Sequence, residues 1–87
     1  MREGKLRHDV ERAAKAEALL RDPTLVEAFD NLEANFIEAW RNTSVADTEN
    51  RERIYHLLSA LQALKGQLHT VIEGGKVAQA NLDNAKT

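Results

Sequence analysis

Cysteine is absent from this sequence, and aromatic residues and long apolar runs are scarce. Without cysteine, disulfide bonds and thiolate metal sites are excluded. Aromatic residues make up only 5% of the chain, and much of the 43% hydrophobic content is alanine, so one chain can build only a thin core. A domain of 87 residues with a thin core often needs oligomerisation for stability, so we expect a homo-oligomer.

No uninterrupted apolar run approaches the roughly 20 residues that span a bilayer. Residues 1–5 are charged and lack the apolar core of a signal peptide. We therefore expect a soluble intracellular protein without membrane contacts. The net charge is −2, but its distribution is uneven: +2 over residues 1–21, −6 over 22–50 and +2 over 51–87. An acidic middle between mildly basic ends suits antiparallel helix packing.

The single proline predicts a boundary between two helices. Pro23 disfavours the helical conformation at Asp22 and suits the first position of a new helix, for which Asp22 is a good N-cap. Strong helix formers precede this point, whereas Gly4 discourages an early start. We predict one helix over about 5–21 and a second over about 23–41.

Apolar residues recur at steps of three and four, the period of one helix face, along most of the chain. The strongest pattern comprises Leu25, Phe29, Leu32, Phe36 and Trp40, followed by Ile54, Leu57, Leu58, Leu61, Leu64, Leu68, Val71 and Ile72. We call these residues the apolar stripe. Its second part predicts a helix over about 47–73, about 40 Å long. The first helix has a shallower face of Leu6, Val10, Ala13, Ala14 and Leu20.

A short polar loop, residues 42–47, separates the two parts of the stripe and offers Ser44 and Asp47 as caps. Helices joined by so short a loop are antiparallel neighbours. The sequence therefore predicts an all-α fold built on an antiparallel helical hairpin over about 23–41 and 47–73.

The two parts of the stripe should meet across this hairpin. Near the turn, Trp40 is expected to pack close to Ile54 and Tyr55. Leu61 and Leu64 are expected to be equivalent members of the stripe, so that aspartate at either position would unfold or disperse the protein.

Glycines mark the end of the third predicted helix. We expect Gly74 and Gly75 to end it with a left-handed cap. Gly66 lies inside the helix, where it either permits a close helix approach or is simply tolerated. Residues 76–87 have little apolar content, so we predict a weakly structured C-terminal segment. The chain is then one small domain, with 1–4 and 76–87 as flexible ends.

Patterns for catalysis or metal binding are not found. His56 and His69 lie thirteen residues apart on one predicted helix, about 20 Å, too far to share a metal. No nucleophile has a base and an orienting group at plausible spacing. Gly74-Gly75-Lys76 lacks the earlier glycine and the following Ser or Thr of a phosphate loop. We expect no enzyme activity, no cofactor and no small-molecule substrate.

Basic residues are concentrated near the N-terminus, at Arg2, Lys5, Arg7, Arg12 and Lys15. Such a segment can bind nucleic acid through phosphates, without sequence preference and with strong salt dependence. The same segment also carries four acidic residues, and no base-reading helix-turn-helix is evident. A solvated helix is the favoured interpretation, and DNA contact is the alternative.

The order of these features over residues 13–82 is similar to that of a known group of proteins. An Ala-rich helix precedes Leu20-Arg-Asp-Pro-Thr-Leu25, Phe29, Leu32, Phe36-Ile-Glu-Ala-Trp40, Arg51-Glu52, Tyr55, the leucines of the stripe, Gly75-Lys76 and Leu82. This resembles small helical proteins of tailed bacteriophages and prophages from head-assembly and DNA-packaging gene clusters.

The resemblance implies a non-enzymatic structural or assembly protein that acts through helix-face contacts and self-association. Its partners would be phage head, connector or packaging proteins, in the host cytoplasm during assembly or in the virion. One alternative is a small terminase subunit that binds viral DNA and regulates the packaging motor. Another, outside phage biology, is a regulatory adaptor that binds a host protein.

Overall fold

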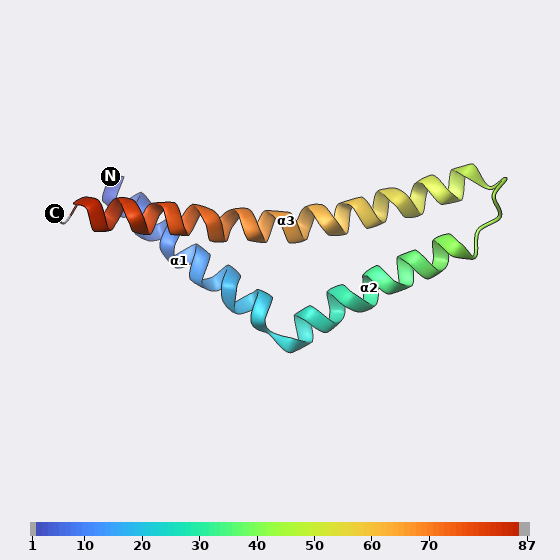
Figure 1. Cartoon of the computed structure of the whole chain (residues 1–87), viewed down its shortest axis with the longest axis horizontal. Helices are drawn as coiled ribbons and strands as arrows, with labels where there is room; N and C mark the ends of the chain where they lie inside the picture. Colours follow the sequence, from blue (N-terminus) through green and yellow to red (C-terminus); the bar gives the residue numbers. More distant parts are fainter. Residues whose placement is uncertain (1, 86–87) are drawn as a thin grey trace.

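The computed structural model describes residues 2–85 and folds them into three α-helices. They are α1 (Arg2–Arg21), α2 (Pro23–Arg41) and α3 (Thr48–Ala85). In Figure 1, α1 crosses the C-terminal half of α3, and α2 runs back toward the N-terminal end of α3. The all-α class is confirmed, and so is a hairpin of α2 and α3 with α1 as an additional helix.

Side-chain caps begin α2 and α3 at the predicted places. One Asp22 carboxylate oxygen accepts hydrogen bonds from the backbone N–H groups of Thr24, at 2.8 Å, and Leu25, at 3.3 Å, with Pro23 at the start of the helix. The Asp47 carboxylate accepts one from the Asn50 N–H at 3.2 Å. Such caps satisfy donors that the helix itself cannot and each contributes about 1 kcal/mol.

Two predicted helix boundaries are wrong. α1 begins at Arg2 rather than near residue 5, so Gly4 lies within its first turn. α3 does not end at Gly74 and Gly75 but continues to Ala85, and no described residue has a positive φ. The weakly structured segment predicted over 76–87 is therefore helical over 76–85. Residues 1, 86 and 87 lie outside the described part of the chain.

The longer α3 is explained by its packing against α1. Gly75 and Ala78 are both buried, and Ala78 is only 2% exposed. A glycine inside a helix costs about 1 kcal/mol relative to alanine. Burial of Gly75 and Ala78 against α1 offsets this cost, and in proteins such packing usually outweighs local propensity.

The closest approach of α1 and α3 is at Gly75. A Cβ atom at this position would overlap the Cβ of Ala13. The crossing consists of small side chains, since Ala13 and Ala16 of α1 are 7% and 4% exposed. At Gly66 an added Cβ would have no neighbour within 4 Å, so the close-approach explanation for that glycine is wrong.

The molecule is elongated, with dimensions of 62 × 25 × 16 Å. Its radius of gyration is 18.4 Å, whereas a compact chain of this length would have about 12 Å. Its accessible surface is 6620 Å², whereas a compact monomer of this mass exposes about 5200 Å². One copy of the chain therefore exposes more surface than a compact fold of the same mass.

Two neighbouring glycines in α3 allow a test of the close crossing. Gly75→Ala should destabilise the protein by about 1–3 kcal/mol, because the added methyl group forces α1 and α3 apart. Gly74→Ala should stabilise it by up to about 1 kcal/mol, because nothing lies within 4 Å of the added atom. Urea unfolding followed by circular dichroism measures both. Equal stabilisation by the two changes would contradict the crossing.

Candidate protein-interaction surface

α3 carries a seven-residue repeat that extends through most of its length. With Ile54 as position a, the a positions are Ile54, Leu61, Leu68, Gly75 and Leu82, and the d positions are Leu57, Leu64, Val71 and Ala78. Every one of these residues is apolar or glycine. A repeat sustained over four heptads is typical of a helix whose seam is covered by other helices.

The cover of this seam differs between the two halves of α3. In the C-terminal half, α1 lies over both kinds of position, and Gly75 and Ala78 are buried. In the N-terminal half, α2 buries the a residues but leaves the d residues open. Leu61 is 8% exposed, whereas Leu57 and Leu64 are 46% and 51% exposed. The seam of α3 is therefore completed by this chain at one end only.

A third exposed leucine, Leu32 of α2, belongs to the same open side of the hairpin. On the opposite side, Ile37 of α2 meets Tyr55 and Leu58 of α3 around a hollow of about 140 Å³. At about 100° per residue, Leu32 lies on the other flank of α2 from Ile37, and Leu57 on the other flank of α3 from Leu58. We call Leu32, Leu57 and Leu64 the leucine face; each is 43–51% exposed.

The rim of the leucine face is poor in charge near its centre. Around its centre lie Ala28, Asn35 and Ala39 of α2 and Ala60 and Gln67 of α3, all exposed, whereas at its Leu57 end Glu49, Glu52 and Arg53 line one hollow with that leucine. Apolar residues surrounded by small or uncharged ones are typical of the centre of a protein interface, from which charged residues are depleted.

At the turn, polar contacts hold α2 against α3. The Arg51 guanidinium lies 3.9 Å from the ring centroid of Trp40 and donates to the Thr43 hydroxyl at 3.2 Å. That hydroxyl donates to the Trp40 carbonyl oxygen at 2.6 Å. Trp40 also lines one hollow with Ile54 and Tyr55, which confirms their predicted proximity. Further along, Lys65 and Glu33 form an ion pair at 3.6 Å.

The structure divides the predicted apolar stripe into three groups. Phe29, Ile54, Leu61 and Ile72 are buried; Leu25, Phe36, Leu58, Leu68 and Val71 are half-buried; Leu32, Trp40, Leu57 and Leu64 are exposed. Three buried residues of the α1–α3 crossing, Ala16, Gly75 and Ala78, were not predicted. Small residues three apart in each helix were the signal for them. The expected burial of Leu64 within the chain is wrong, because α2 covers only Leu61.

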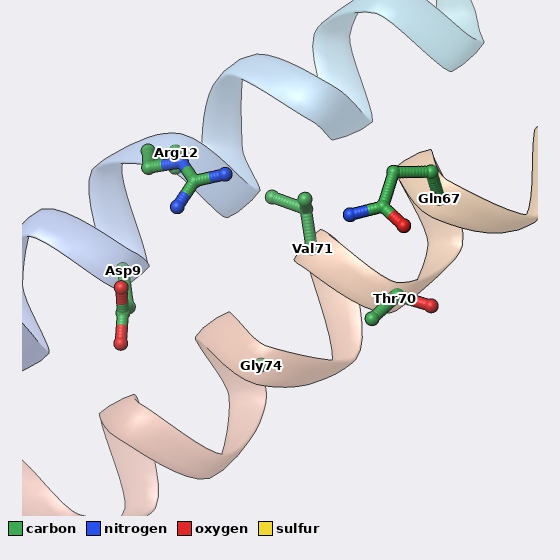
Figure 2. A pocket seen from close by; sticks show the side chains of 6 residues that line it. All are labelled: Asp9, Arg12, Gln67, Thr70, Val71 and Gly74. Carbon is green, nitrogen blue, oxygen red and sulfur yellow. The ribbon is translucent and has the colours of Figure 1, made fainter. Parts of the chain in front are cut away.

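The five basic residues near the N-terminus are all exposed on α1. At about 100° per residue, Arg2, Lys5, Arg12 and Lys15 fall within an arc of about 140°, and Arg7 lies apart from them. Arg7 and Arg12 lie about 140° apart around the helix axis. Arg12 lines a hollow of about 220 Å³ that also contains Asp9 (Figure 2), whereas Arg7 lines another that also contains Glu11. The structure thus distributes these cations among acidic neighbours.

The described residues contain no cluster of metal-binding side chains and no buried polar residue. Within residues 2–85, no three His, Asp or Glu side chains are placed to share a metal ion, and no polar or charged residue is buried. Of the helices in that range, none combines the length and hydropathy required to cross a membrane. The leucine face is the feature of this part of the chain that most needs explanation.

Leu61 and Leu64 provide a test of which side of α3 is covered. Leu61→Asp should lower the free energy of unfolding by at least about 2–5 kcal/mol, because it removes a buried leucine and buries a charge. Leu64→Asp should retain the native circular dichroism spectrum, because its side chain faces solvent in the single chain. Loss of helicity in both variants would contradict the assignment.

Comparison with known protein families, curated proteins and solved structures found no match to this chain. Its function is therefore inferred from its own residues and geometry.

Proposed function

We propose that this chain is a non-enzymatic assembly protein that acts through helix-face contacts with other protein chains, including copies of itself. The observation that carries this proposal is the incompletely covered seam of α3, where Leu57 and Leu64 stay about half exposed. Full burial of a leucine contributes about 1.5–3 kcal/mol. A group of exposed leucines on one face therefore favours association with a partner.

The kind of partner follows from the resemblance to small helical phage proteins. We propose phage head, connector or packaging proteins as partners, in the host cytoplasm during assembly or in the virion. The elongated shape supports such a role, because a rod of 62 Å can contact several chains along its length. A regulatory adaptor for a host protein would use the same face, and only its partner would differ.

The small-terminase alternative has less support from the geometry. Such a subunit needs a surface that attracts phosphate groups. Here Arg7 lies apart from the other basic residues of α1, and Arg12 and Arg7 each have an acidic residue in the same hollow. Within the described chain, the leucine face is a better-defined surface than any basic one.

The mass of the protein in solution tests self-association. Light scattering on a sizing column should give a multiple of the chain mass of 9.8 kDa. The value should be the same at low and high salt, because apolar contacts are not screened by ions as exposed charges are. A mass of 9.8 kDa at every protein concentration would contradict self-association.

Binding to duplex DNA distinguishes the assembly function from the small-terminase alternative. Fluorescence anisotropy with labelled DNA should detect no salt-sensitive binding. Binding to phosphate groups would weaken steeply between about 50 and 200 mM salt. The triple variant Arg7→Glu/Arg12→Glu/Lys15→Glu is the control and should behave as the unchanged protein does. Salt-sensitive binding that this variant abolishes would support the terminase function instead.

A further inference from the structure

We propose that the leucine face binds a second copy of this chain, with the two α3 helices antiparallel and the twofold axis near Ala60. This inference rests on the proposed assembly function and adds the identity and orientation of one partner. The resulting dimer contains a central four-helix bundle made of two α2–α3 hairpins.

The surface left open is large enough for such a dimer. The chain exposes 6620 Å², about 1400 Å² more than a compact monomer of its mass. A stable interface of standard size buries about 800 Å² on each partner. The excess surface of the whole elongated chain is therefore larger than the area that one such interface covers.

The row of d positions explains why a second copy fits. The midpoint between Leu57 and Leu64 falls beside Ala60. In an antiparallel pair with its axis there, Leu57 of each copy lies opposite Leu64 of the other. Ala60 lies close to Ala60 of the second copy, and small side chains at such a contact permit a short distance between helix axes. A twofold contact of this kind uses one self-complementary patch twice.

Charges at the two ends of this row favour the antiparallel arrangement. Beside Leu57, the first turns of α3 form a hollow that contains Glu49, Glu52, Arg53 and His56, with more acidic than basic side chains. Beyond Leu64, the row continues at Val71, which is half-buried beside α1 and lines the hollow of Asp9 and Arg12. In Figure 2, the Arg12 and Gln67 side chains extend into the space between α1 and α3.

In the antiparallel pair, the hollow beside Leu57 of one copy faces the hollow beside Val71 of the other copy. Glu49 of one copy then comes within reach of Arg12 of the second, and Arg53 within reach of Asp9. A parallel pair would instead place Glu49 beside Glu49 and Arg53 beside Arg53. Exposed ion pairs contribute only about 0–1 kcal/mol each, so they select the orientation while the leucines supply the affinity.

Single cysteines test the orientation directly, because the native chain has none. A mixture of the Leu57→Cys and Leu64→Cys variants should form a disulfide-linked dimer under mild oxidation. Each variant oxidised alone should form little of this dimer. Ser59→Cys is the control, because position 59 is exposed and lies on the opposite side of α3 from Leu57. It should form little dimer in any mixture.

Aspartate variants provide a second measurement that does not depend on cross-linking. The unchanged protein should have a mass of 19.6 kDa, twice the 9.8 kDa of one chain. Leu64→Asp should reduce it to 9.8 kDa with helicity retained. Val77→Asp is the matched control, because Val77 is a 62% exposed aliphatic residue of α3 outside the face, and should leave the dimer intact.

The outcomes separate this inference from the function on which it rests. Dimers formed by Leu57→Cys alone and Leu64→Cys alone would show a parallel pair and overturn the orientation, while self-association would stand. An oligomer unaffected by Leu64→Asp would overturn the choice of face. A monomeric native protein would overturn both the dimer and the self-association in the proposed function.

Discussion

The close crossing of α1 and α3 at Gly75 is the contact on which the rest of this structure depends. It allows the two helices to approach each other through small side chains at the crossing, although α1 has no large apolar face of its own. Because Gly75 has no side chain, Ala13 packs directly against the α3 backbone. This contact accounts for the burial of Gly75 and Ala78 and covers the seam in that half of the helix.

The same geometry leaves the other half of the seam incomplete. After α1 ends, α2 runs in a new direction toward the N-terminal end of α3 (Figure 1). It lies over the a residues of α3, and Leu57 and Leu64 stay open on one flank. A chain of 87 residues has too little apolar mass to cover every face of a helix of 38 residues. The thin core therefore leaves exposed leucines on a helical rod, and these are the basis of the assembly function that we propose.

Much of the fold could be predicted from local chemistry. The Asp22 and Asp47 caps, Pro23 and the short loop over 42–47 define where α2 and α3 begin, and they require only neighbouring residues. The hairpin follows from the loop length and the apolar period. The end of α3 could not be predicted in this way, because two adjacent glycines usually end a helix and here they lie inside one.

The sequence by itself determined the helical class, the capped boundaries and the residues available for burial, since these depend on contacts within a few positions along the chain. Only the tertiary structure decided which stripe residues are buried. Leu61 and Leu64 have the same side chain and belong to the same repeating apolar pattern, but α2 covers Leu61 and not Leu64. The candidate site exists because of that difference, which arises from the position of α2 against α3 and not from either residue.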